Sequence, residues 1–252
     1  MTVTSNLATE QRLTWLGTQL DTQGNVRIGQ AAQKLGVSEM TIRRDLLELE
    51  GLGVARRVRG GAVAVGPVSF EGRLQTRARA KSKIAAKLRP MIPATGAIGL
   101  DSSSTLLRLA GLLDRARDLI VVTNGRDAFA ALQDKPGVSA LLTGGNLEGH
   151  TGSLIGPHAC RGASSVLLNR LFLSAAAIDP QVGSSETTIG GAEVKQSMAS
   201  VASEVVLAVD AAKLGTRALA PAMGWDRVAL LVTELEPSDS RLDPYRDRVA
   251  LL

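Results

Sequence analysis

Two adjacent arginines, Arg43 and Arg44, form the most informative pair of functional side chains in the sequence. A guanidinium group binds phosphate and can donate two parallel hydrogen bonds to the edge of a guanine, so an exposed arginine pair is suited to DNA. Ser38, Glu39 and Thr41 stand just upstream, and serine is a residue type that caps the first turn of a helix. The alternative is an ordinary charged helix surface, which this short pattern fits equally well.

The apolar residues around the arginine pair predict a helix-turn-helix that would position it. Ile42, Leu46 and Leu49 recur at intervals of four and three, which places them on one face of a helix. A second stripe over residues 28–35 predicts a shorter helix, and Gly36-Val37-Ser38 is typical of the turn between two such helices. The arginine pair falls outside the apolar face and is expected to point to solvent.

A β-hairpin is predicted directly after the second helix. Residues 54–63 contain two short β-like runs around a Gly-Gly turn. Three arginines lie in this segment, Arg56, Arg57 and Arg59. Such a hairpin is expected to lie along the DNA backbone as a wing. Upstream, regularly spaced leucines predict a first helix from about Thr9 to Leu20 that supports the core.

The charge distribution separates the two ends of the chain. Residues 1–89 hold 15 Lys and Arg against 7 Asp and Glu, a net charge of +8, whereas residues 90–252 hold 14 against 17, a net charge of −3. A basic end followed by a near-neutral remainder is typical of a nucleic-acid-binding module joined to another domain. Binding through basic residues should weaken steeply with salt, because counterions are released from the DNA.

Composition bounds the class of protein. The chain has 252 residues, of which 44% are hydrophobic and only 2% aromatic, so a core must rest on Leu, Val, Ile and Ala. The single cysteine, Cys160, excludes an internal disulfide framework, and no Cys/His cluster predicts a metal site or a cofactor. Residues 1–6 do not resemble a signal peptide, and no apolar run approaches 18 residues. We therefore expect a cytoplasmic protein with no membrane partner.

The domain boundary is predicted at Gly66-Pro67, a pair that stops both helices and strands. This gives a winged helix-turn-helix over residues 1–65, a basic connector over 66–89 and a larger α/β domain over 90–252. The connector either adds phosphate contacts or forms a solvated helix with Ile84 and Leu88 packed on the second domain. The second interpretation is favoured.

Short apolar runs alternate with helix-like segments from residue 90 onward. Six such runs cover residues 97–100, 119–122, 138–142, 171–173, 205–209 and 228–232. Continuous apolar runs are typical of parallel strands covered on both faces, so the pattern predicts an α/β fold. Polar residues follow the runs, at Asp101, Thr123-Asn124, Thr143-Gly144-Gly145, Ser174, Asp210 and Thr233-Glu234. Open α/β sheets bind their ligands at this edge.

The first of these polar segments is suited to an anion. Asp101, Ser102, Ser103, Ser104 and Thr105 stand between a predicted strand and a predicted helix. Backbone N–H groups and hydroxyls at a helix N-terminus can hold a phosphate. The same residues would also cap the helix if no ligand were present.

These motifs resemble those of the DeoR family of bacterial transcriptional regulators. The N-terminal resemblance covers roughly residues 7–63 and rests on Gly36-Val37-Ser38, Thr41-Ile42-Arg43-Arg44-Asp45-Leu46, Leu49-Glu50 and Gly60-Gly61-Ala62. It implies operator DNA as a partner, with Ser38, Glu39, Thr41, Arg43 and Arg44 at the major groove. Arg56, Arg57 and Arg59 would contact phosphates or the minor groove. Arg59 replaces the His that relatives usually carry, and this adds charge to the wing.

The resemblance extends over most of residues 70–236 and implies a sensor domain that resembles the sugar-phosphate isomerase fold. It rests on Asp101–Thr105, Thr123-Asn124, Gly144-Gly145, Gly156-Pro157, Glu193-Val194-Lys195 and Asp210–Lys213. Residues 102–105 would hold the phosphate of a sugar-phosphate effector. The other effector-binding positions that the resemblance implies are Asp101, Thr123, Asn124, Gly144, Gly145, Glu193, Lys195, Asp210 and Lys213. Lys213 could equally pair with Asp210 as part of the structure.

Two departures from the family pattern affect the expected effector. Asn169 stands where relatives usually carry Asp, which would remove a carboxylate near the pocket, so the ligand is expected to differ from the commoner ones. Ser103 often corresponds to Gly, which leaves the geometry of the anion-holding loop open.

The expected function is a regulator, in this family mostly a repressor of sugar metabolism, whose operator binding responds to a phosphorylated sugar. A homodimer or tetramer is expected because one module contacts only a few base pairs. The alternative from another class is an isomerase-like enzyme that uses Asp179, Glu193 and Lys213. Such an enzyme would have no use for residues 7–63.

Overall fold

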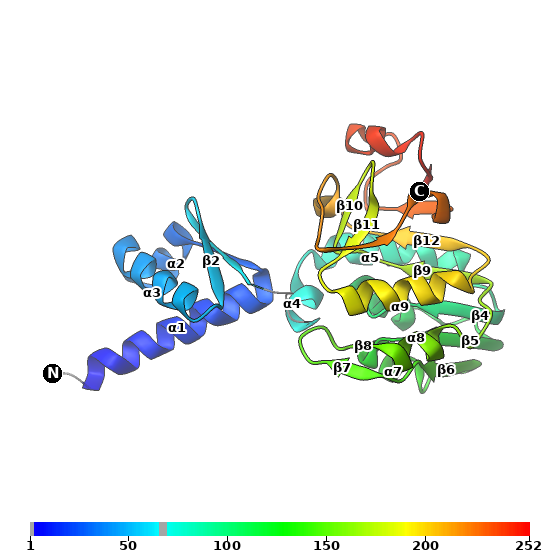
Figure 1. Ribbon diagram of the computed structural model, residues 1–252, viewed down its shortest axis with the longest axis horizontal. Helices are drawn as coiled ribbons and strands as arrows, with labels where there is room; N and C mark the ends of the chain where they lie inside the picture. The colour runs from blue at the N-terminus through cyan, green and yellow to red at the C-terminus, as the bar shows by residue number, and fades with distance from the viewer. Residues whose placement is uncertain (1–2, 66–69) are drawn as a thin grey trace. The chain divides into compact units, whose positions relative to one another are not determined.

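The computed structural model describes residues 3–65 and 70–252, and the chain divides into two compact units, Met1–Thr76 and Arg77–Leu252 (Figure 1). Gly66-Pro67, where the sequence predicts a boundary, lies outside the described residues. The division falls inside the predicted connector, whose two halves belong to different units.

The N-terminal unit is a winged helix-turn-helix. Its helices are α1 (Val3–Gln23), α2 (Ile28–Leu35), α3 (Glu39–Gly51) and α4 (Phe70–Gln75), and its strands are β1 (Asn25–Arg27), β2 (Ala55–Val58) and β3 (Gly61–Ala64). The strands form an antiparallel sheet in the order β1-β3-β2. The predicted helix pair and hairpin are confirmed, while α1 is longer than the predicted span from Thr9 to Leu20.

The core of this unit is formed by the predicted apolar stripes. Ile28 and Ala31 of α2 are buried against Ile42 and Leu46 of α3, with Leu20 from α1 beneath them. Gly36 ends α2 in the left-handed conformation, with φ of 65° and ψ of 31°, which glycine adopts at little cost. The turn therefore directs α3 away from α2 with its apolar face inward.

Helix α4 packs on α1 and belongs to the N-terminal unit. A Cβ placed on Gly72 would lie 2.3 Å from the Cα of Thr22, so only a glycine permits this approach. The Thr76 hydroxyl also donates to the Thr22 carbonyl at 3.3 Å. The first half of the predicted connector is thus part of the N-terminal unit.

The second unit is built on a seven-stranded parallel sheet. Its strands are β4 (Thr95–Leu100), β5 (Asp118–Thr123), β6 (Val138–Leu142), β9 (Arg170–Leu173), β12 (Val205–Ala208), β14 (Leu230–Val232) and β15 (Ala250–Leu251). The order is β15-β14-β12-β9-β4-β5-β6, and every pairing is parallel. All six predicted runs are therefore confirmed as strands of one sheet.

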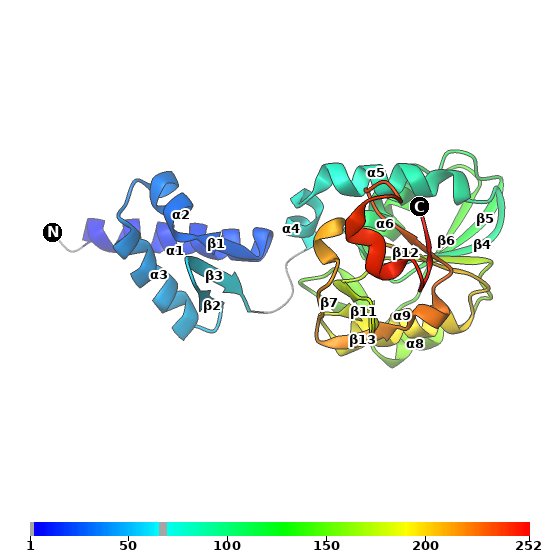
Figure 2. The same ribbon diagram turned by 90° about the horizontal axis from the view of Figure 1, so that it is seen from above.

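Helices cover both faces of this sheet, as Figure 2 shows for α5 and α6 on one side and α8 and α9 on the other. The helices are α5 (Ala78–Leu88), α6 (Ser104–Gly111), α7 (Arg126–Leu132), α8 (Pro157–Ala163) and α9 (Ile189–Ser200). Successive strand residues enter opposite cores: Phe172 packs with Ile84 and Leu88 of α5, while Leu171 packs with Met198 of α9. This packing of α5 supports the favoured interpretation of the connector.

Smaller elements complete the second unit. Strands β10 (Ala177–Asp179), β11 (Gly183–Glu186) and β13 (Ala220–Met223) form an antiparallel sheet, and β7 (Asn146–Glu148) pairs with β8 (Ser153–Ile155). Four 3-10 helices are η1 (Arg89–Met91), η2 (Ala211–Lys213), η3 (Trp225–Arg227) and η4 (Ser240–Tyr245). The Tyr245 hydroxyl donates to the Ile178 carbonyl at 3.2 Å and accepts from the Gly215 amide at 2.8 Å, which fixes η4 to the smaller sheet.

Candidate functional sites

The start of α3 presents a basic, polar surface. Ser38 caps the helix: its hydroxyl accepts from the Thr41 amide at 3.1 Å and lies 2.9 Å from the Thr41 hydroxyl. Arg43 and Arg44 are exposed, and Arg43 reaches Glu39 one turn earlier at 3.4 Å, a pair open to solvent on both sides. The arginine pair is therefore available to a ligand, because an exposed ion pair contributes little that DNA phosphate could not replace.

The residue after the arginine pair points in the opposite direction. Asp45 is buried, and Arg12 of α1 donates to both of its carboxylate oxygens, at 2.8 and 3.1 Å. This bidentate pair joins α1 to α3 and fixes the rotation of α3 about its axis. Sequence reasoning missed it, because the only signal is an acidic residue on the apolar stripe with a partner 33 residues away.

The hairpin is fixed to the end of α3 by one of its three arginines. Glu50 accepts from the Arg57 amide at 2.9 Å and from the Arg57 guanidinium at 2.6 Å. These hydrogen bonds hold the pKa of Glu50 below its usual value. Arg56 and Arg59 are exposed on the same hairpin. Among the three wing arginines, these two are therefore the ones free of a carboxylate partner in the part of the chain that the structure describes.

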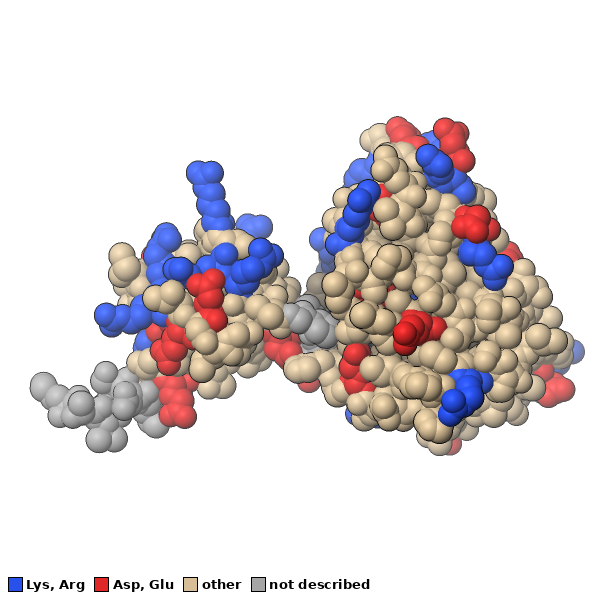
Figure 3. Space-filling model, viewed as in Figure 1, with Lys and Arg blue, Asp and Glu red and all other residues tan. Residues whose placement is uncertain are grey.

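Basic side chains cover one side of the N-terminal unit. In Figure 3 blue Lys and Arg groups gather over the side that carries the β2–β3 hairpin, α2 and α3, and red acidic groups lie below them. The exposed basic residues of these elements are Arg27, Lys34, Arg43, Arg44, Arg56, Arg57 and Arg59. A surface of one sign next to an exposed helix start suits a polyanion.

The second candidate site lies at the carboxyl edge of the parallel sheet. The chain runs from β4 to β5 and β6 in one direction, and from β9 to β12 and β14 in the other. The loops after β4 and β9 therefore separate at a topological switch point, where open α/β sheets form a crevice. These two loops begin with Asp101 and Ser174.

Asp101 is buried and organises the two loops rather than facing the crevice. One carboxylate oxygen accepts from the Ser103 amide at 2.9 Å, and the other accepts from the Ser174 amide at 2.8 Å and lies 3.0 Å from Lys195 Nζ. Burial by itself raises the pKa of this carboxyl, but the Lys195 charge and the hydrogen bonds outweigh it and keep the pKa below its usual value.

Lys195 is equally engaged by the protein. Its ammonium group donates to the Ser174 carbonyl at 2.7 Å and to Glu186 at 2.5 Å, in addition to Asp101. Burial would lower the pKa of this lysine, but the two carboxylates raise it above its usual value. All three N–H donors are thus used, so Lys195 holds the crevice together and has no donor left for a ligand.

Lys213 is the lysine at this edge whose charge is left uncompensated. Its ammonium group donates to the Ala175 carbonyl at 2.5 Å and lies 3.3 Å from the Ser174 hydroxyl. No carboxylate of the described residues lies within ion-pair distance of it. Burial lowers its pKa, and the more distant charges of Asp210 and Glu186 oppose this only in part. A half-buried cation with a spare donor is suited to an anion.

The loop after β4 has the geometry expected of an anion-binding turn. Ser103 caps α6 by accepting from the Leu106 amide at 3.2 Å, and the Ser102 hydroxyl lies 2.6 Å from the Ser153 hydroxyl. Ser104 and Thr105 are buried in the first turn of α6. Ser102 and Ser103 are therefore the partly exposed hydroxyls of this loop.

Asn124 supplies an unused acceptor beside this loop. Its Nδ2 atom donates to the Leu154 carbonyl at 3.2 Å, while its buried Oδ1 atom has no hydrogen-bond partner among residues 3–65 and 70–252. The neighbouring Gly125 packs so closely on Ser102 that an added Cβ would lie 2.8 Å from the Ser102 Cα. The hydroxyl group of a ligand could complete the hydrogen bonding of Oδ1.

Three of the residues predicted to bind the effector, Thr123, Gly145 and Asp210, make contacts within the protein. Thr123 is buried and its hydroxyl accepts from the Gly125 amide at 3.1 Å. Gly145 packs against α8, where an added Cβ would lie 2.7 Å from the Cβ of Ala159, while Gly144 has open space around it. Asp210 caps η2, its carboxylate accepting from the Ala212 amide at 3.2 Å.

Two residues expected at or near the effector site lie away from the crevice. Glu193 is exposed on the outer side of α9 and is not brought to the cluster that contains Lys195. Residues two apart on a helix point in nearly opposite directions, so only one of the two can face the sheet. Asn169 precedes β9 and accepts from the Ala97 amide at 2.9 Å, near the start of β4, so it lies at the amino edge and removes no carboxylate from the crevice.

The residues nominated for an isomerase do not come together. Asp179 accepts from Arg217 at 2.8 Å and from the amides of Gln181 and Val182, and these hydrogen bonds lower its pKa to about 2. A carboxylate so engaged is a poor general base near neutral pH. With Glu193 exposed on α9, only Lys213 of the three lies at the crevice.

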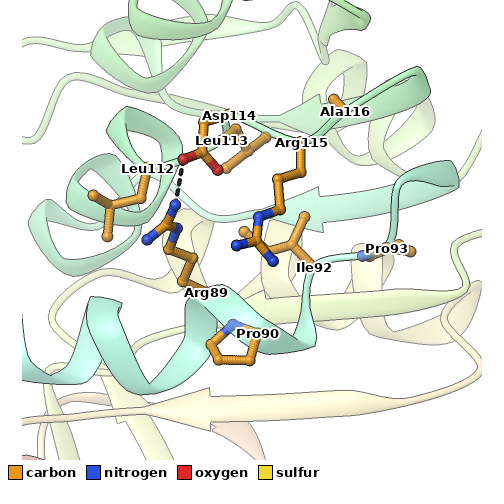
Figure 4. A pocket seen from close by; sticks show the side chains of 9 residues that line it. All are labelled: Arg89, Pro90, Ile92, Pro93, Leu112, Leu113, Asp114, Arg115 and Ala116. Carbon is orange, nitrogen blue, oxygen red and sulfur yellow. Dashed lines mark hydrogen bonds and ion pairs between the residues drawn. The ribbon is translucent and has the colours of Figure 1, made fainter.

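A hollow of about 150 Å³ lies at the opposite edge of the sheet (Figure 4). It is lined by Arg89, Pro90, Ile92, Pro93, Leu112, Leu113, Asp114, Arg115 and Ala116. Asp114 neutralises Arg89 across its mouth. No residue predicted for either site lines this hollow, so it is not the candidate effector site.

Two features are absent from the described residues. Within residues 3–65 and 70–252, no helix combines the length and apolar character needed to span a bilayer. In the same ranges, no group of three or more His, Cys, Asp or Glu side chains could hold a metal ion.

The chain is similar to known regulators along almost its whole length. Residues 12–68 match the family model of the DeoR-like helix-turn-helix domain, and residues 76–235 match that of the DeoR C terminal sensor domain. The HTH-type transcriptional repressor GlcR of Bacillus subtilis (strain 168) is 31% identical over 245 residues, which cover 93% of this chain and 92% of the relative. The transcriptional repressor AccR of Agrobacterium fabrum is 32% identical over 212 residues, 82% of either chain.

Among solved structures, a D-ribose-5-phosphate isomerase in complex with phospho-erythronic acid matches with a TM-score of 0.39 and 16% identity. The match covers 53% of this chain and 52% of the isomerase. At this score the likeness carries no conclusion about activity.

Proposed function

This chain belongs to the DeoR family of transcriptional regulators, and on that premise we propose that it represses a sugar-metabolism operon by binding operator DNA. A phosphorylated sugar bound in the second unit changes its operator affinity. The observation that carries the proposal is the orientation of α3. Asp45 is held inward by Arg12, and the neighbouring Arg43 and Arg44 are exposed beside the capped start of the helix.

The DNA-binding role follows from the side chains that lie at the start of α3 and on the wing. The N-terminal residues of a recognition helix contact base edges in the major groove, and the side chains there are Ser38, Glu39, Thr41, Arg43 and Arg44. Arg56 and Arg59 of the wing would contact phosphates, which position the protein without reading sequence. Arg57 contributes less to DNA binding, because Glu50 already neutralises it.

The effector role is supported by three groups at the carboxyl edge of the sheet. The loop of Ser102 and Ser103 offers hydroxyls at the start of α6, Lys213 offers an uncompensated cation, and Asn124 offers a free acceptor. A phosphate suits the first two, and a hydroxylated sugar suits the third. Asp101 and Lys195 act indirectly in this proposal, by holding the two loops in place.

The proposal includes a homo-oligomer. A single module of this size contacts only a few base pairs, so specific binding requires two modules on a two-fold symmetric site. Light scattering on the purified chain is the measurement that determines the number of copies.

The isomerase alternative is not supported. Its three nominated residues are dispersed, and the relatives reported above are transcriptional repressors.

One experiment tests the proposal. An operator duplex is first selected from random-sequence DNA by the full chain and used in gel retardation. The Arg43→Ala/Arg44→Ala variant should bind this duplex more than about 30-fold more weakly, because each arginine on a base edge contributes about 1–3 kcal/mol. Ribose 5-phosphate, glucose 6-phosphate and fructose 6-phosphate are then added to the wild-type complex, and one or more should change its affinity.

The matched control is Arg115→Ala/Arg117→Ala, which removes two exposed arginines from the second unit. It should retard the duplex as the wild type does. Equal retardation by the Arg43/Arg44 variant, with an unchanged circular dichroism spectrum, rejects the role of α3. A wild-type complex that no sugar phosphate affects, while thermal shift shows no binding, rejects these sugars as effectors.

A further inference from the structure

The boundary between the two units falls between Thr76 and Arg77. On one side, Thr76 closes α4, which is anchored to α1 through the Thr22 carbonyl. On the other side, the Arg77 carbonyl accepts from the Lys81 amide at 3.1 Å and so begins α5. Thr76 and Arg77 are therefore the two residues between α4 and α5, and they form the joint through which the chain passes from one unit to the next.

The backbone of Arg77 is in an unfavourable conformation. Its φ of 54° and ψ of 35° place it in the left-handed region. It is the one non-glycine residue with positive φ in the described part of the chain. The left-handed conformation is unfavourable for an arginine, because its Cβ crowds the backbone there. Contacts made by the side chain or its surroundings must therefore hold it.

One such contact links the joint to the candidate effector site. Arg77 Nε lies 3.5 Å from Asp210 Oδ1, and the side chains are 51% and 3% exposed. Asp210 lies two residues after β12 at the carboxyl edge of the sheet, and its carboxylate also accepts from the Ala212 amide in η2. Because the Asp210 carboxylate is buried, it depends on these few partners for compensation of its charge.

The same turn carries the cation proposed to bind the effector. The Lys213 amide donates to the Asp210 carbonyl at 3.0 Å, and its ammonium group reaches the carbonyl of Ala175. A movement of η2 toward an anion beside Lys213 would therefore also move the carboxylate that Arg77 contacts. Asp210 is the residue shared by the joint and by the turn that carries Lys213.

We propose that the Arg77–Asp210 ion pair holds Arg77 in its left-handed conformation and so fixes the backbone of the joint. An anion bound beside Lys213 acts on the joint through the same pair. The assignment of that anion rests on the proposed function, whereas the role of the pair in holding the joint does not. Arg77 is a positioning residue: it touches Asp210 and acts on DNA binding only through the joint. When the pair is lost, Arg77 relaxes toward the common helical or extended region and redirects the chain.

The test measures the distance between the two units by double electron–electron resonance in the full chain. Spin labels are placed at Gln11→Cys on α1 and at Leu167→Cys, two exposed positions, in a Cys160→Ser background. Arg77→Gln removes the guanidinium and leaves a residue that disfavours the left-handed region, and Asp210→Asn removes the charge of its partner. Each should shift or broaden the distance distribution, and the double variant should change it no further.

The matched control is Asp239→Asn, which breaks the Asp239–Arg241 ion pair elsewhere on the second unit. It should leave the distance distribution unchanged. If Arg77→Gln and Asp210→Asn also leave the distribution as it is in the wild type, the pair does not set the joint and the inference is wrong. Circular dichroism and thermal melting show whether either variant is folded. If Arg77→Gln unfolds it is replaced by Arg77→Met, and if Asp210→Asn unfolds it is replaced by Asp210→Ser; the same shift is expected of each.

A second arm adds inorganic phosphate or ribose 5-phosphate to the labelled wild type. Binding seen by thermal shift together with a changed distribution supports transmission through the pair. Binding without a change overturns transmission. If neither probe binds, the proposed effector assignment loses support, while the Arg77 and Asp210 variants still decide whether the pair holds the joint.

Discussion

Two lysines at the carboxyl edge of the sheet differ in their partners, and this difference decides what each can do. Lys195 is buried between Asp101 and Glu186, so its charge is neutralised by the protein itself. Lys213 reaches only uncharged oxygens, those of Ser174 and Ala175. A phosphate arriving in the crevice would therefore gain more from Lys213 than from Lys195.

The lowered pKa of Lys213 predicts how sugar-phosphate binding depends on pH. Burial makes its ammonium form lose the proton at a lower pH than an ordinary lysine does. Above about pH 7 the ligand phosphate is already doubly ionised, so its own charge no longer changes. Affinity for a bound sugar phosphate should thus fall as the pH rises from 7.5 to 10, as measured by isothermal titration calorimetry.

Two Lys213 variants test whether the pH dependence of the affinity comes from the charge of this lysine. Lys213→Arg keeps its charge over the whole range, so its affinity should stay nearly constant. Lys213→Gln should bind weakly at every pH. A wild-type affinity that does not change up to pH 10 would show that the Lys213 charge makes no contact with the phosphate.

The sequence indicated which residues lie at the carboxyl edge of the sheet, but not which of their side chains interact. It named Asp101, Lys195 and Lys213, all of which lie at the carboxyl edge of the sheet. It could not show that Lys195 closes on Asp101, because the two are brought together only by the packing of α9 on the sheet. Nor could it choose between Glu193 and Lys195, since the choice depends on which side of α9 is buried.

At the scale of elements, the wing is held to α3 by Glu50, and this fixes which of its arginines remain available. Arg57 is bound by that carboxylate through both its backbone and its guanidinium. Arg56 and Arg59 extend from the same hairpin without such a partner in the described part of the chain. The hairpin can thus keep its position while two of its cations contact DNA.

The salt dependence of DNA binding should report these contacts. Each phosphate contact contributes a slope of about −0.9 to a plot of log K against log salt, so Arg56→Ala/Arg59→Ala should reduce the slope by about 2. Binding should weaken to a similar extent on selected and random duplexes, because phosphates carry no sequence. Fluorescence anisotropy at several salt concentrations measures both quantities. An unchanged slope would mean that the wing does not lie on the backbone.

Helices and strands could be predicted where their apolar residues form a regular pattern over a short stretch of sequence. The stripe of Ile42, Leu46 and Leu49 gave α3, and the continuous apolar runs gave six strands of the parallel sheet. The strand order was not predictable, because it depends on where β9 returns beside β4. The small sheet of β10, β11 and β13 was missed, since its strands are short and β11 is mostly Ser and Gly.

At the scale of the whole molecule, the two sites must influence each other equally. If a sugar phosphate changes operator affinity by some factor, the operator changes sugar-phosphate affinity by the same factor, and such factors are typically about 5–150-fold. Titrating the sugar phosphate with and without saturating operator should therefore reproduce the factor found by retardation. Arg77→Gln should bring both factors close to one. A disagreement between the two wild-type factors would show that one assay is not at equilibrium or that the oligomer changes.

The position of α4 also decides how the DNA-binding half could be grafted onto another sensor. A fragment truncated after the wing at Val65 would leave bare the part of α1 around Thr22 that Gly72 covers. A fragment that continues to Thr76 includes α4, which covers this part of α1, and it ends where the next unit begins. Chimeras joined at Val65 would thus expose this part of α1, whereas chimeras joined at Thr76 would not.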